Sequence, residues 1–186
     1  MIGKKNIVFG FLFLVLTAAL GPYMIVQYVP GVGEAQAKKQ SSVGRLQALK
    51  ADDFEEDLEA LPPEAIAKAN TDGILALNTL LNAQQPVDMI KGGPHAHGNL
   101  ESLLNIAVGI VLAYLAISTI FKQVISWIFI VGTVLHSGVM YLMVMFQWGW
   151  AATILNTGVG PALILLGLLL AGVATFIGYK GQPIQD

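Results

Sequence analysis

The chain has 186 residues, of which 55% are hydrophobic and 12% charged, against roughly 25% charged residues in an average soluble domain. The net charge of −2 offers no basic face for nucleic acid, which needs one to neutralise phosphates. The absence of cysteine excludes disulfides, thiolate metal sites, Cys-ligated iron–sulfur clusters and covalent c-type haem attachment. The composition therefore predicts an integral membrane protein that could hold a cofactor only through other ligands, such as His, Met, Tyr or carboxylate.

Four apolar segments reach or approach the roughly 20 residues that cross a bilayer. In chain order they are Ile7–Val29, Leu103–Phe121, Val124–Phe146 and Gly158–Tyr179. We predict an all-α integral membrane protein with four transmembrane helices and a small helical extracytoplasmic insertion between the first and second. Its three parts are an N-terminal transmembrane anchor (1–29), an extracytoplasmic helical hairpin region (30–98) and a three-helix transmembrane bundle (99–186).

The first apolar segment has an alternative interpretation as a cleaved signal. Ala35-Gln36-Ala37 satisfies the small-residue rule for a cleavage site, and Gly21-Pro22 interrupts the apolar run. The run from Ile7 to Val29 is nevertheless longer than the 7–15 residues of a signal core. We therefore favour an anchor; cleavage would leave three spans.

The polar region carries most of the charge, with six Lys or Arg and ten Asp or Glu between Pro30 and Gly98. We expect an acidic helix from about Val43 to Leu61, stopped by Pro62-Pro63, and a second helix from about Pro63 to Ala83. Asp72-Gly73 is expected to turn or kink the second helix. This hairpin has few large apolar residues, so we expect it to lean on the membrane bundle or on a partner.

Orientation follows from the Lys and Arg residues that flank the spans, which favour the cytoplasmic side. Lys4 and Lys5, Lys122 and Lys180 all fit one arrangement in a bacterial inner (cytoplasmic) membrane. Both termini are then cytoplasmic, and residues 30–98 are periplasmic or extracellular.

His136 is the one ionisable side chain at the middle of an apolar segment, where such a group is costly and usually marks a site. Gly132 lies one turn before it and Met140 one turn after it. A histidine with a soft sulfur ligand beside a gap suits haem or Cu(I). The alternative is that His136 only hydrogen-bonds a neighbouring helix, while the methionine fills irregular packing.

His95 and His97 lie just before the second span, after the bend-forming Gly92-Gly93-Pro94. In a loop or at a helix start both rings can turn toward one ion, and Glu101 lies one turn after His97. We therefore predict a metal site of His95, His97 and Glu101. The competing interpretation makes Asn99 the N-cap of the second span, with Glu101 facing the positive end of the helix dipole.

The predicted heights of His97 and His136 differ. If Lys122 marks the inner end of both helices, His97 lies 25 residues from it and His136 only 14. At ~1.5 Å per residue the offset is about 16 Å, too large for one haem iron. We therefore expect two positions, one superficial and one buried, or a dimer that pairs His136 with its mate.

The run His95-Ala96-His97-Gly98-Asn99-Leu100-Glu101 resembles the His-x-His-x-Asn-Leu start of a helix in small bacterial membrane proteins distantly similar to the haem-binding subunit of haem-copper oxidases. Leu135-His136-Ser137-Gly138 is similar to a second histidine-bearing span of that kind, and the resemblance covers Gly92–Tyr141. It implies that the histidines hold haem or copper. The chain departs from those subunits in having four spans rather than a dozen and too few histidines for a haem–copper centre, so we expect no oxygen reduction.

Two hypotheses follow. In the first, the chain is a small inner-membrane haem b- or copper-binding protein, with His136, Met140, His97 and His95 as candidate cofactor ligands. It serves as a redox or assembly subunit of a respiratory-type complex and is not an enzyme on its own. In the second, it is a cofactor-free scaffold or sensor whose outer helical region binds a partner. A channel or transporter ranks last, since broken helices with polar midpoints are lacking. Besides the lipid bilayer, the expected partners are another subunit of a membrane complex or a second copy of the chain.

Overall fold

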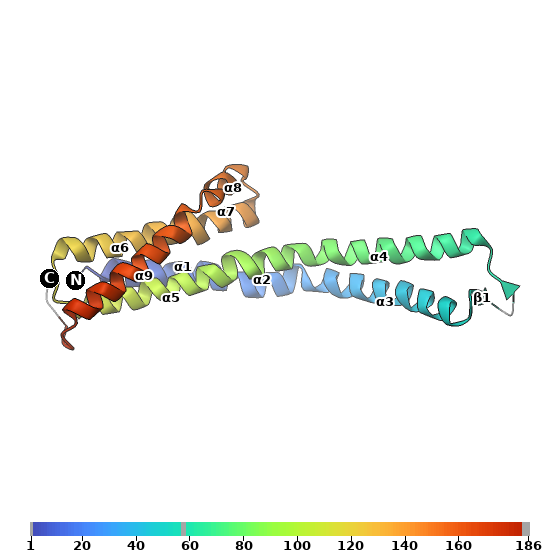
Figure 1. Ribbon diagram of the computed structural model, residues 1–186, viewed down its shortest axis with the longest axis horizontal. Coiled ribbons are helices and arrows are strands. Elements are labelled where there is room, and N and C mark those ends of the chain that lie inside the picture. The colour runs from blue at the N-terminus through green and yellow to red at the C-terminus, as the bar shows by residue number, and fades with distance from the viewer. Residues whose placement is uncertain (1, 57–58, 184–186) are drawn as a thin grey trace. The chain divides into compact units, whose positions relative to one another are not determined.

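The chain folds almost entirely into helices, which satisfy their own backbone hydrogen bonds and so can cross a bilayer. The computed structural model describes residues 2–56 and 59–183. They form two units: one contains the residues up to 22 and those from 89 onward, and the other contains residues 23–88 (Figure 1). The first unit carries the candidate site.

The first unit is a bundle of helices with one π-helical turn and one kinked segment. Its elements, two of which are shared with the second unit, are α1 (Lys4–Ala18), α2 (Leu20–Gln27), the end of α4 (Pro63–Ile90), η1 (Lys91–His95), α5 (Ala96–Leu112), α6 (Thr119–Thr133), η2 (Val134–Gly138), α7 (Val139–Phe146), α8 (Gly149–Asn156) and α9 (Val159–Gly178). Gln147, at φ 55°, ends α7, and Gly158, at φ 68°, precedes α9. Glycine is suited to this second turn because it adopts positive φ without steric cost.

Three helices among the described residues are long and apolar enough to cross a membrane. They are Lys4–Gln27, Thr119–Phe146 and Val159–Gly178, and they correspond to three of the four predicted spans. The fourth, predicted over Leu103–Phe121, is placed differently: α5 begins earlier and ends at Leu112. Ser118 then caps α6 by accepting a hydrogen bond from the Phe121 N–H, so the prediction of one helix through Phe121 was wrong.

The segment between α5 and α6 is joined to the end of α9 by backbone hydrogen bonds. The Ala116 N–H donates to the Gly178 carbonyl at 2.7 Å, and the Lys180 N–H donates to the Tyr114 carbonyl at 3.1 Å. These bonds satisfy backbone groups that the helix ends leave open. The turn is therefore a fixed part of the bundle.

Helices α1 and α5 approach closely because small residues line their contact. A Cβ added to Gly109 would lie 2.6 Å from the Gly3 carbonyl oxygen, and one added to Gly10 would lie 2.6 Å from the Ser102 carbonyl oxygen. Packing through small residues is the usual means of helix association in membranes. The sequence analysis did not identify this contact.

Helix α9 packs against α6 and η2 in a similar way. The side chain of Ile164 lies against Gly132, and a Cβ on Gly167 would lie 2.9 Å from Cε2 of Phe129. Phe129 and Ile164 belong to the hydrophobic core of this unit, together with Val108, Leu112, Leu115, Ile125 and Ala174.

The second unit is a helical hairpin of α3 (Val29–Ala51) and α4 (Pro63–Ile90), joined by the two-stranded β1 (Glu55–Glu56) and β2 (Glu59–Ala60). The predicted acidic helix Val43–Leu61 was wrong at both ends. Helix α3 starts earlier and stops before the acidic run, where Asp53 and Phe54 adopt positive φ. Negative charges at a helix C-terminus oppose the dipole, so the helix ends before them; the last acid of the run, Asp57, lies outside the described residues.

Helix α4 begins at Pro63 as predicted but continues to Ile90 without a turn at Asp72-Gly73. Gly73 instead faces α3, where the absence of a side chain leaves room for Leu46. A Cβ added to Gly73 would lie 2.6 Å from Cδ1 of Leu46. Buried positions recur along α4 at helical spacing, at Ala69, Ala76 and Leu80. The hairpin therefore has a narrow seam built largely of small residues.

Candidate metal centre

The candidate site lies on α5 and η2, next to the segment η1, which contacts η2. A π-helical turn inserts an extra residue into a helix and changes which side chains face a neighbour, and such turns are frequent at functional sites. In η1 the backbone departs from helical geometry at Gly93 (φ −97°, ψ −115°), just before Pro94. The segment η2 contains His136 at its centre.

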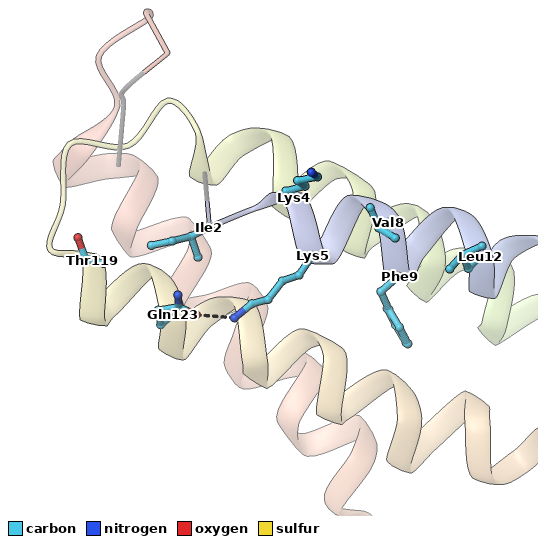
Figure 2. A pocket seen from close by; sticks show the side chains of 8 residues that line it. All are labelled: Ile2, Lys4, Lys5, Val8, Phe9, Leu12, Thr119 and Gln123. Atoms are coloured by element: carbon cyan, nitrogen blue, oxygen red, sulfur yellow. Dashed lines mark hydrogen bonds between the residues drawn. The ribbon is translucent and has the colours of Figure 1, made fainter.

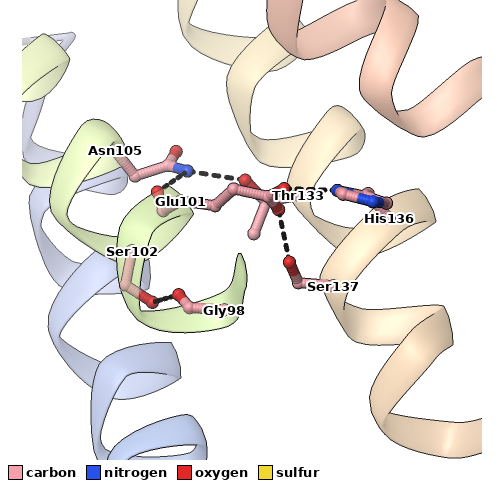
Figure 3. A network of polar contacts seen from close by, with 7 residues as sticks. All are labelled: Gly98, Glu101, Ser102, Asn105, Thr133, His136 and Ser137. Atoms are coloured by element: carbon pink, nitrogen blue, oxygen red, sulfur yellow. Dashed lines mark hydrogen bonds and ion pairs between the residues drawn. The ribbon is translucent and has the colours of Figure 1, made fainter. Parts of the chain in front are cut away.

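Glu101 and His136 form a direct contact between α5 and η2 (Figure 3). Nδ1 of His136 lies 2.5 Å from Oε1 of Glu101, and the hydroxyl of Ser137 donates to Oε2 of Glu101 at 2.7 Å. Glu101 is 4% exposed. With Glu101 as a carboxylate, which can only accept hydrogen bonds, Nδ1 of His136 is the donor and Nε2 of that ring is left for a metal ion.

His97 completes a group of three possible ligands. Its ring lies 5.0 Å from that of His136, centre to centre, at an interplanar angle of 64°. One ligand atom from each of His97, Glu101 and His136 lies within 4.8 Å of the others. An ion bound at about 2.1 Å holds tetrahedral ligands roughly 3.4 Å apart, so the hydrogen bond between Glu101 and His136 would have to open before all three residues could bind one ion. Two histidines and one carboxylate form a donor set for a first-row transition metal.

The predicted 16 Å offset between His97 and His136 was wrong. It counted every residue from Lys122 as helical rise, but α5 ends at Leu112 and residues 113–118 form the turn. His97 lies 15 residues above the end of α5, and His136 lies 17 above the start of α6 at Thr119. At ~1.5 Å per residue the two heights differ by only about 3 Å.

A buried hydrogen-bond network supports the site from the side of α1. Nδ2 of Asn105 donates to the Glu101 carbonyl at 3.0 Å and to the Thr133 hydroxyl at 2.9 Å, and Nδ2 of Asn6 donates to Oδ1 of Asn105 at 3.0 Å. The Ser126 hydroxyl donates to Oδ1 of Asn6. Every buried side-chain polar atom of the described residues has a hydrogen-bond partner.

Sequence reasoning did not identify this network or the role of Ser137. The available signal was polar residues recurring along one helix face, at Ser126, Thr133 and Ser137, within a segment otherwise apolar enough to cross a membrane. The network fixes the registry of α1, α5 and α6, because its bonds join named residues of the three helices and a shift of one helix would break them.

His95 lies apart from the other predicted ligands. Its Nδ1 lies 2.9 Å from the Thr17 carbonyl oxygen and 3.5 Å from Nδ2 of Asn99, so its ring faces α1 rather than His97. Asn99 is inside α5, which begins at Ala96, and its Oδ1 accepts a hydrogen bond from the Thr17 hydroxyl at 2.8 Å. The interpretation of Asn99 as an N-cap was therefore wrong.

Two further residues of the predicted site have defined positions. Met140 lies on α7 with its sulfur beside Gly93, where an added Cβ would be 3.1 Å away, so it adjoins the segment that leads into His97. The gap predicted beside Gly132 is filled by Ile164. No slot for a flat cofactor therefore exists at that point.

Gly160 of α9 lies directly on the backbone of the site. A Cβ at this position would be 2.6 Å from the His136 nitrogen and 2.7 Å from the Leu135 carbonyl carbon. The absence of a side chain on Gly160 therefore sets where η2, and with it His136, can lie.

Comparison of the chain with protein-family models, with curated proteins and with solved structures found no match.

Proposed function

We propose that this chain is a membrane protein that holds a transition-metal ion between His97 and His136, with Glu101 orienting the His136 ring, and that it serves as a small redox or assembly subunit of a respiratory-type complex. The observation that carries the proposal is a buried carboxylate that fixes one of two adjacent histidine rings. A carboxylate that accepts from the far nitrogen of a ligating histidine is the usual outer partner of a protein metal site. An isolated Glu–His pair in an apolar bundle would be costly without such a use.

The geometry favours an ion over haem b. Two imidazoles on opposite sides of one haem iron have ring centres roughly 6 Å apart, whereas the ring centres of His97 and His136 are 5.0 Å apart. Copper fits best, because histidine ligands bind Cu²⁺ most tightly among the first-row divalent ions. After reduction, the thioether of Met140 is the kind of ligand that Cu(I) prefers.

In the proposed topology α5 crosses the membrane in addition to the three helices named above, which gives four crossings. Its 17 residues span about 25 Å at 1.5 Å per residue, close to the ~30 Å hydrocarbon thickness. Lys4, Lys5 and Lys180 favour cytoplasmic termini in a bacterial inner membrane. Lys122 is buried, at 1% exposure, so its charge says little about which side of the membrane this end of α6 faces. Residues 30–98 would then be extracytoplasmic.

The proposal is tested on full-length protein purified in detergent, by metal analysis and by absorbance spectra before and after reduction. We expect about one copper per chain, lost in His97→Ala and in His136→Ala. His95→Ala is the matched control, since it removes a histidine two residues away that faces α1, and it should retain the metal. A Soret band would identify haem instead. Colourless, metal-free protein, or equal loss in all three variants, would refute the proposed site.

A second function, a scaffold or sensor that binds a partner, has one observation in its favour. Helix α4 exposes Ile74, Leu75, Leu77 and Leu81 at 45–69%, and exposed apolar stripes of this kind often mark contact surfaces. A cofactor-free protein would leave this stripe as the functional surface. Another membrane subunit or a second copy of the chain is the expected occupant.

A further inference from the structure

A groove between the beginnings of α1 and α6 combines positive charge with an apolar wall. It has a volume of about 860 Å³, and Lys4, Lys5, Thr119 and Gln123 line its polar end. Figure 2 shows Lys5 reaching from α1 toward α6, where its ammonium group donates a hydrogen bond to Gln123. The ammonium also lies 4.2 Å from the centre of the Trp127 ring. Lys5 is thus held in place at the polar end by two contacts, and the exposed Lys4 adds a second positive charge beside it.

Positive potential is concentrated at this end of the groove. Helices α1 and α6 both begin here, at Lys4 and Thr119, and each contributes the positive end of its dipole. No acidic residue is among the described residues that line the groove. The polar end therefore favours an anion.

The remaining wall of the groove is apolar and continues into a second groove. Val8, Phe9 and Leu12 line the first groove beyond the lysines, and Phe9 also lines the second, of about 480 Å³. Phe13 and Leu16 of α1 and Leu142 of α7 continue the second wall. A ligand with an anionic head at Lys5 could lay a hydrocarbon chain along α1 past Phe9.

We propose that this groove binds an anionic phospholipid, with the phosphate at Lys4 and Lys5 and an acyl chain along Phe9. Basic residues between membrane helices are the usual contacts of anionic head groups, and each adds about fivefold to binding near the membrane surface. A free phosphate would leave the apolar wall of the groove without a binding partner, whereas an acyl chain would cover it. The head-group end of the groove shares no residue with the metal centre, so binding of the phosphate can be tested separately.

Trp127 provides the measurement. In full-length protein carrying Trp148→Phe and Trp150→Phe, Trp127 is the only tryptophan, and its fluorescence is quenched by lipids brominated near the head group. We expect brominated phosphatidylglycerol to quench at lower mole fraction than brominated phosphatidylcholine. Lys5→Gln should reduce this preference about fivefold, and Lys4→Gln with Lys5→Gln about 30-fold.

Lys180→Gln removes the same charge away from the groove and should leave the preference unchanged. Equal quenching by the two lipids, or a preference that survives the double substitution, would overturn the proposal. Relief of quenching by inorganic phosphate at millimolar concentration would show a small-anion site and would equally overturn it. Because these readouts need no bound metal, they remain decisive whether or not the metal centre is confirmed.

Discussion

Gly160→Ala tests how the site is positioned, because α9 touches η2 through backbone at this residue. The added Cβ would lie 2.6 Å from the His136 nitrogen and 2.8 Å from its Cβ, about 0.8 Å short of the 3.4 Å at which ordinary contact begins. The atoms it meets belong to the backbone and Cβ of η2, which cannot move aside by a rotamer change. Either α9 or η2 must shift, and overpacking of this kind costs about 1–3 kcal/mol.

The matched control is Gly172→Ala on the same helix, where an added Cβ meets nothing within 4 Å. In a helix interior this change stabilises by up to about 1 kcal/mol. Thermal unfolding in one detergent should therefore lower the midpoint for Gly160→Ala and leave it unchanged or raised for Gly172→Ala. At about 2–4 °C per kcal/mol for a chain of this size, the two midpoints should differ by several degrees. If Gly160→Ala unfolds at or above the wild-type midpoint, the close contact of α9 with His136 is wrong.

Three other substitutions test separate contacts. Glu101→Gln replaces the acceptor of His136 and should weaken copper binding about 10–100-fold in a competition titration; unchanged affinity would mean that Glu101 neither ligates nor orients. Asn105→Ala removes a hydrogen-bond partner of Asn6 and Thr133 and should lower the free energy of unfolding by about 1–2 kcal/mol. The control is Thr79→Ala, whose exposed hydroxyl bonds its own helix; an equal loss of stability in both variants would contradict a supporting network. Gly109→Ala should lower the unfolding midpoint because its Cβ meets the Gly3 carbonyl, whereas Gly31→Ala, which meets nothing within 4 Å, should not; a midpoint unchanged by Gly109→Ala would place α1 further from α5.

The sequence by itself determined the helical class, three apolar segments long enough to cross a membrane and the beginning of α4 at Pro63. These follow from composition and local chemistry: apolar length indicates a span, and proline is tolerated at the start of a helix. The residue types of the candidate site were also visible, since His95, His97 and His136 are the only histidines in the chain.

Only the tertiary structure decided which of these residues meet. The end of α5 at Leu112 removed the assumed offset and brought His97 level with His136, whereas His95 turned to the Thr17 carbonyl. The sequence does not reveal this, because a helix end, a kink at Gly93 and one π-helical turn decide which way the later side chains face, and all three depend on packing from other segments. Gly160 is the clearest case: only its contact with η2 from α9 shows what positions His136.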